Sequence, residues 1–168
     1  GAPANGTRWL KHQWTAQHGE EGWKKFLAEV NTDRERRVQG EPSKVVRLIG
    51  GFIPVEPDQI PFFEEFLAAH PIMVSDAPLE VADDVLFFWP EEMAGRIAPT
   101  PIRFIHGTAD PVVNVQEARI FYERAGEPKD LHLVKDGIHQ LLSPEDNGEE
   151  KANQAAELVL EWFERYLT

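Results

Sequence analysis

The chain has 168 residues, 42% of them hydrophobic, which is enough to bury one ordinary core. Its formal net charge of -12 argues against nucleic acid and against an anionic membrane surface as partners, because both require a basic face. The absence of cysteine excludes disulfides, thiolate metal sites and a cysteine nucleophile. Since the sequence has neither a long apolar run nor a signal peptide, we expect a cytoplasmic protein.

The first half of the chain is predicted to consist of loops and helices. Residues 1–8 are rich in turn formers and predict a loop. Apolar residues at near-helical spacing predict helices over residues 20–38, 58–70, 78–88 and 91–97. Residues 45–55 predict a short strand or an irregular apolar segment. Inside the first helix, the charged run of residues 33–37 is typical of a solvent-exposed face.

The second half alternates strands and helices. Apolar runs predict strands at residues 101–106 and 131–134, and between them a helix begins after Asn114, with Glu117 in capping-box position. A last helix is predicted over residues 149–167. Its buried stripe is predicted to consist of Ala152, Ala156, Val159, Phe163 and Tyr166. A strand, a helix and a second strand in this order form a right-handed parallel unit, so we predict an α/β fold.

Two residues with catalytic chemistry follow these strands. Asp110 lies on the loop after the first strand, and His139 lies on the loop after the second. Because parallel strands end at the same edge of a sheet, a carboxylate oxygen of Asp110 should lie within about 3.2 Å of an imidazole nitrogen of His139. A carboxylate there fixes the tautomer of the imidazole and stabilises its protonated form, as in a nucleophile–histidine–acid triad. Asp136 is the competing acid, but it lies on the same turn as His139, which is an awkward geometry.

Short motifs surround these two residues. They are His-Gly-Thr-Ala-Asp-Pro-Val-Val at 106–113, Tyr-Glu-Arg-Ala-Gly at 122–126, Gly-Ile-His at 137–139 and Phe-Trp-Pro-Glu at 88–91. Together they resemble the C-terminal third of the α/β-hydrolases, especially the dienelactone hydrolase and bacterial esterase or acyl-peptidase branch. The resemblance implies Asp110 as the triad acid and His139 as the general base. It further implies that residues 98–168 are the C-terminal β-α-β-α segment of a hydrolase domain and that residues 1–97 are a loop and helical cap-like region.

The nucleophile motif of that family does not occur in the sequence. The family requires Gly-x-Ser-x-Gly, in which a strained turn exposes the serine and helps to build the oxyanion hole. The serines of this chain are Ser43, Ser75 and Ser143, and none lies in such a motif. Because the family order is nucleophile, acid, histidine, we expect the serine upstream of Gly1, on an N-terminal polypeptide that is the partner of this chain. The alternative is a catalytically inactive, hydrolase-like binding or interaction module.

The resemblance implies hydrolysis of a small-molecule carboxylic ester, lactone or amide without a cofactor. We predict that an aromatic group ahead of the catalytic strands forms part of an apolar substrate pocket, although such a stripe is also typical of a core. This group consists of Phe62, Phe63, Phe66 and Trp89. The remaining histidines lack the spacing of metal ligands, so no metal site is predicted. His106 is predicted to pack beneath the loop of the acid.

Overall fold

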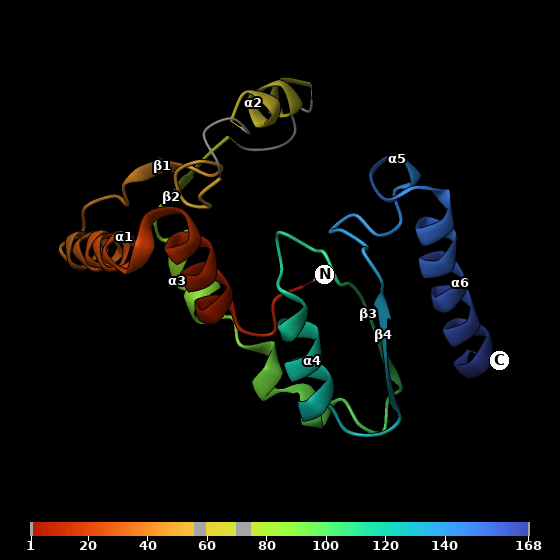
Figure 1. Ribbon diagram of the computed structural model, residues 1–168. Coiled ribbons are helices and arrows are strands. Elements are labelled where there is room, and N and C mark those ends of the chain that lie inside the picture. The colour runs from red at the N-terminus through yellow and green to blue at the C-terminus, as the bar shows by residue number, and fades with distance from the viewer. Residues whose placement is uncertain (1, 56–59, 70–74, 168) are drawn as a thin grey trace. The chain divides into compact units, whose positions relative to one another are not determined.

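The computed structural model describes residues 2–55, 60–69 and 75–167 of the chain (Figure 1). The chain forms two compact units. One consists of Gly6–Phe88, and the other combines Gly1–Asn5 with Trp89–Thr168. Within the described ranges, no helix is apolar over the length that crossing a bilayer requires.

Helices dominate the unit Gly6–Phe88. Its elements are α1 (Gly6–Val38), β1 (Val45–Arg47), α2 (Ile60–Ala69), β2 (Asp76–Pro78) and α3 (Val81–Leu86). Strands β1 and β2 pair antiparallel, and β1 lies where the sequence predicts a short strand. Helix α3 begins later than predicted, because residues 76–78 pair with β1 instead.

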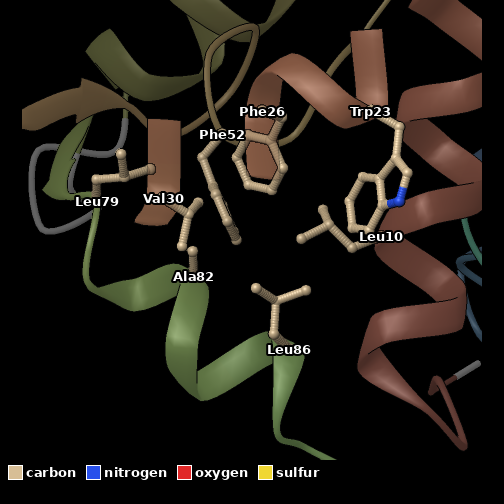
Figure 2. Packing of buried hydrophobic residues seen from close by; sticks show 8 residues of the cluster. All are labelled: Leu10, Trp23, Phe26, Val30, Phe52, Leu79, Ala82 and Leu86. Carbon is tan, nitrogen blue, oxygen red and sulfur yellow. The ribbon is translucent and has the colours of Figure 1, made fainter. Parts of the chain in front are cut away.

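Helix α1 consists of two arms that meet at Gly19. This glycine has a φ of 67°, a left-handed conformation that it adopts without strain, and the helix kinks there. The helix begins at Gly6, so the prediction of a loop over residues 1–8 is wrong from Gly6 onward and holds for residues 2–5. Figure 2 shows that both arms contribute to one apolar cluster. The cluster contains Leu10, Trp23, Phe26, Val30, Phe52, Leu79, Ala82 and Leu86.

The charged run of α1 is not a wholly solvent-exposed face, so this prediction is also wrong. Asp33 is only 3% exposed. Its carboxylate accepts hydrogen bonds from the backbone N–H of Lys44 (2.6 Å), from Oγ of Ser43 (2.9 Å) and from Nε of Arg37 (3.0 Å). Arg37 also donates to Asp83 of α3, over 2.6 Å. The run therefore joins α1 to α3 and to the segment that enters β1.

Strands and helices alternate in the other unit. Its elements are η2 (Pro90–Glu92), η3 (Ala94–Arg96), β3 (Ile102–Gly107), α4 (Val115–Arg124), β4 (Lys129–Val134), α5 (Pro144–Asn147) and α6 (Glu149–Tyr166). Strands β3 and β4 pair in parallel, in a register that runs from Ile102 opposite Lys129 to Gly107 opposite Val134. This pairing confirms the predicted α/β fold. The short helix α5 is absent from the sequence-based prediction.

Helices α4 and α6 lie on opposite sides of the two strands (Figure 1). On one side, the rings of Phe104 and Phe121 of α4 have centroids 5.1 Å apart. On the other side, the guanidinium of Arg103 lies 4.6 Å from the ring centroid of Trp162 of α6. Adjacent residues of β3 thus serve opposite layers, as the alternation of a strand requires. The buried stripe of α6 is only partly as predicted, because Ala152 is buried but Phe163 is 52% exposed.

The start of α4 differs in one respect from its prediction. Asn114 caps the helix as expected, since its Oδ1 accepts a hydrogen bond from the backbone N–H of Gln116 over 2.9 Å. The carboxylate of Glu117 is buried and accepts hydrogen bonds from the backbone N–H groups of Ala4 (2.8 Å) and Asn5 (3.0 Å). Glu117 therefore holds the segment before α1 rather than only capping its own helix.

Candidate active site

The loop after β3 fixes one oxygen of the Asp110 carboxylate. Oδ1 accepts hydrogen bonds from the backbone N–H groups of Val112 and Val113, each over 2.8 Å. The side chain is only 1% exposed. Burial by itself raises the pKa of Asp110, but hydrogen bonds from Val113, His139 and Val112 outweigh burial, and the pKa is lowered. Asp110 is therefore an ionised carboxylate with a fixed orientation.

His139 lies against this carboxylate. Its Nδ1 is 2.9 Å from Oδ2 and 3.1 Å from Oδ1 of Asp110, which confirms the predicted distance between the two residues. Both of these contacts of Nδ1 are with Asp110 rather than with the competing acid, Asp136, whose backbone N–H donates to Oγ1 of Thr108 over 2.8 Å. The His139 side chain is 29% exposed. Since Nδ1 donates to Asp110, Nε2 is the nitrogen that can exchange a proton with a reacting group.

The two loops lie together because β3 and β4 end together. Past the last register pair, the backbone N–H of Thr108 donates to the carbonyl of Val134 over 2.9 Å. The N–H of Ala109 donates to the carbonyl of Gly137 over 3.0 Å. The strand pairing thus continues into the loops and brings the acid and the histidine within contact distance.

His106, on strand β3, contacts both Asp110 and the loop that carries it. Its Nε2 is 2.8 Å from the carbonyl oxygen of Val113 and 3.4 Å from Oδ2 of Asp110. Because both neighbours are acceptors, Nε2 must carry the proton. Burial lowers the pKa of His106, and the hydrogen bond to Val113 only partly opposes this effect. His106 is thus a neutral donor beneath the acid loop, where the sequence predicts it.

The serines of the chain are engaged in local structure. Oγ of Ser43 donates to Asp33 and accepts from the N–H of Glu80. Ser75 donates to Asp76 over 2.9 Å. Ser143 is the N-cap of α5, where its Oγ accepts from the N–H of Asp146 over 3.3 Å. The hydrogen-bond partners of the three hydroxyls are thus carboxylates and backbone N–H groups, and the location of the nucleophile stays a prediction.

A hollow of about 380 Å³ lies beside His139. Its wall is mostly apolar. It is lined by Ile105, His139, Gln140, Leu141, Leu142, Ser143, Ala155 and Val159. Among the residues that the structure describes, no group of three or more His, Asp or Glu side chains is arranged to hold a metal ion.

The predicted substrate-binding aromatics do not all fall within the described part of the chain. The side chains of Phe62, Phe63 and Phe66 lie outside the described residues, although the backbone of helix α2 is described. Trp89 is 43% exposed and belongs to the unit that carries Asp110 and His139. The aromatic pocket therefore stays a prediction.

Comparisons with known proteins identify the fold. The chain resembles the α/β-hydrolase GrgF from Penicillium sp. sh18, with a TM-score of 0.55 and 20% identity, over 80% of this chain and 47% of GrgF. It resembles DcsB, solved with a substrate analogue, with a TM-score of 0.59 and 18% identity, over 82% of this chain and 50% of DcsB. A monoacylglycerol lipase of Paleococcus ferrophilus gives a TM-score of 0.53 at 17% identity, over 79% and 50% of the two chains.

In sequence, the chain is 33% identical to the uncharacterized protein YfhR of Escherichia coli K12 over 70 residues, which are 42% of this chain and 25% of YfhR. No family model matches. The chain spans a quarter of this curated relative and about half of each solved structure. Its fold is that of the C-terminal portion of an α/β-hydrolase, which confirms the resemblance seen in the sequence at the level of the fold.

Proposed function

We propose that this chain supplies the acid and the general base of a serine hydrolase that cleaves a carboxylic ester, a lactone or an amide. The observation that carries the proposal is the 2.9 Å contact between Oδ2 of Asp110 and Nδ1 of His139. An ionised acid at Nδ1 favours the neutral tautomer that carries its proton there, so Nε2 is basic. This is the state in which an imidazole can accept the proton of a nucleophile.

In the proposed reaction, the serine of a Gly-x-Ser-x-Gly motif transfers its hydroxyl proton to Nε2 of His139 while its oxygen attacks the carbonyl carbon. Asp110 stabilises the imidazolium that forms. His139 then donates this proton to the leaving alcohol or amine, and the bond to the leaving group breaks to give an acyl-enzyme. Water then attacks the acyl carbon while it loses a proton to the same imidazole. The bond to the serine oxygen breaks, the imidazolium returns its proton to that oxygen, and the carboxylic acid is released.

The serine is proposed to lie on an N-terminal polypeptide that pairs with the free edge of β3. Within the described residues, β3 pairs with β4 alone. The hollow beside His139 reaches Ile105 of β3, and a second hollow, of about 250 Å³, is lined by Phe104 of β3 and Phe121 of α4. A strand with one unpaired edge and with space on both faces favours a further strand with its own covering side chains.

The exposed side of α6 supports the same partner. Leu160 and Phe163 are three residues apart, so they share one face of the helix, and Leu167 follows directly after its end; all three are exposed. A contiguous apolar face on a helix is typical of a surface that another part of the protein covers. The aromatic pocket of Phe62, Phe63, Phe66 and Trp89 is proposed to bind the acyl or leaving group of the substrate.

The test begins with the protein isolated from its native source through a tag on this chain. The isolated particle is treated with a fluorophosphonate, which reacts covalently with activated serines, and assayed with p-nitrophenyl acetate. The label is expected on a Gly-x-Ser-x-Gly peptide of the same particle. His139→Ala should lower kcat by about 10³-fold or more, since triad members act as a unit.

The chain offers a matched control for that variant. His132 forms a second histidine–aspartate pair, with Nε2 2.9 Å from Oδ2 of Asp130, on strand β4 rather than on the loop after it. His132→Ala should leave both the labelling and the turnover unchanged. A wild-type particle that gives neither label nor turnover would contradict the proposal and would favour the alternative, an inactive hydrolase-like binding module.

A further inference from the structure

One buried amide spans the loop that carries His139. The side chain belongs to Asn147, the last residue of helix α5, which is 7% exposed. Its Oδ1 accepts a hydrogen bond from the backbone N–H of Ile138 over 2.8 Å. Its Nδ2 donates to the backbone carbonyl of Gln140 over 2.6 Å. The amide thus contacts the residue before His139 and the residue after it.

The orientation of this amide follows from its partners. Ile138 offers only a donor and Gln140 only an acceptor at these positions, so a flipped amide would place donor against donor and acceptor against acceptor. Both polar ends of the side chain are used on one loop. Because the amide is rigid and planar, it sets the separation between the N–H of Ile138 and the carbonyl of Gln140, and the three residues 138–140 lie between these two groups.

The backbone of Asn147 is itself held by hydrogen bonds within α5 and to the loop before it. Its backbone N–H donates to the carbonyl of Ser143 over 3.0 Å, and Ser143 is the N-cap of α5. The N–H of Ser143 in turn donates to the carbonyl of Gln140 over 3.0 Å. A closed set of contacts therefore runs from Gln140 through α5 and back to Ile138, with His139 in the middle.

We propose that Asn147 is a positioning residue for the general base: it holds the loop so that Nδ1 of His139 meets the Asp110 carboxylate and Nε2 points to the nucleophile. The catalytic part of this inference rests on the proposed hydrolase function. Asn147 touches neither the acid nor the imidazole, so it acts through the backbone alone. A displacement of about 1 Å at a reacting group can cost about 10²-fold in rate, which makes this support kinetically important.

The experiment compares Asn147→Ala and Asn147→Asp in the assembled protein. Asn147→Ala removes both contacts and should lower kcat by about 10²-fold while KM stays within about threefold. Asn147→Asp keeps the acceptor for Ile138 and the shape of the side chain, but it sets a second acceptor against the carbonyl of Gln140, so kcat should fall in this variant as well. The matched control is Asn153→Ala, an exposed position of α6.

A spectroscopic measurement separates positioning from mere stabilisation. The Nδ1 proton of His139, in the bond to Asp110, should give a resolved low-field proton resonance in the wild type. In Asn147→Ala, this resonance should broaden or disappear well below the melting temperature. A purely structural role would lower the melting temperature but would leave the resonance and kcat unchanged in the folded protein, and that result would overturn the inference.

The two proposals fail in different ways. An inactive wild-type particle would remove the hydrolase function, but the low-field resonance would still decide whether Asn147 orders the loop. An active wild type with an equally active, folded Asn147→Ala variant would remove the positioning role and leave the hydrolase function intact. If Asn147→Ala does not fold, kcat and the low-field resonance are measured on Asn147→Asp instead, in which the shape of the side chain is kept.

Discussion

The Cα of Gly107 and the carbonyl of Gly137 are so close that a Cβ on Gly107 would lie 2.1 Å from the carbonyl oxygen. Gly107 ends β3, and Gly137 lies two residues before His139, so this approach sets the separation of the two catalytic loops. No side chain fits there without movement of the backbone. The glycine of the His-Gly motif is therefore required by the approach of the loops and not by its own φ.

Gly107→Ala is expected to push the two loops apart. The variant should lose about 2–3 kcal/mol in the free energy of unfolding, as overpacked sites do, and it should lose the contact between Asp110 and His139. Denaturant titration measures the first effect, and the low-field resonance of His139 measures the second. The control is Gly95→Ala, because a Cβ there would meet only an ordinary contact of 3.5 Å. Equal stability of the two variants would contradict the prediction.

Asp110→Asn is expected to preserve the loop and destroy its function. The amide oxygen can still accept from Val112 and Val113, but the amide nitrogen would face Nδ1 of His139 and favour the wrong tautomer. In the assembled hydrolase, kcat should fall by about 10³–10⁴-fold with little loss of stability. Asp136→Asn is the control, because Asn tolerates the φ of 53° at this position. A larger loss in the Asp136 variant would make Asp136 the acid.

His106 provides a prediction about pH. Because burial lowers its pKa in the folded state, the unfolded chain binds the proton first as the pH falls below about 6.5. The free energy of unfolding should therefore decrease with acidification from that pH. The charges of the chain's N-terminus, Asp110 and His139 also act on the pKa of His106, and all three groups remain in the variants. His106→Leu should be less stable at pH 8, by about 1–3 kcal/mol, and should show a flatter pH dependence.

The matched variant for this position is His106→Gln. The amide nitrogen of Gln can occupy roughly the place of Nε2 and donate to the carbonyl of Val113, so most of the stability at pH 8 should return. The pH dependence should stay flat, because Gln does not titrate. Thermal melts of the three proteins between pH 5 and pH 8 provide the comparison. Identical slopes in the wild type and in His106→Leu would show that His106 does not titrate in this range.

Asp33 makes the corresponding prediction for the unit Gly6–Phe88. Burial by itself raises the pKa of Asp33, but the hydrogen bonds from Lys44, Ser43 and Arg37 outweigh it, and the pKa is lowered. Its stabilisation is therefore present above about pH 3.9 and is lost as the pH falls through the lowered value. Asp33→Ala should cost about 2–3 kcal/mol at neutral pH. Glu35→Ala, on an exposed position of the same helix, should cost almost nothing.

Local pattern was sufficient for most elements of the second half of the fold, although not for α5. The strands β3 and β4, the cap of α4 at Asn114 and the last helix all follow from apolar spacing and from end signals within a few residues. The pairing of Asp110 with His139 was also predictable, although 29 residues separate them. The reason is topological: a strand, a helix and a strand in succession bring both loops to one edge of a parallel sheet.

Some contacts between different elements have no periodic pattern in the sequence. Only the tertiary structure shows them. In the sequence, Asp33 is part of a charged run, but in the structure it accepts hydrogen bonds from Lys44 and Ser43. Glu117 is in capping-box position, but its carboxylate accepts hydrogen bonds from Ala4 and Asn5. Asn147 gives no signal in the sequence, because its partners are backbone groups of a loop seven and nine residues away. Burial of a polar side chain depends on what packs over it, and spacing along the chain does not contain that information.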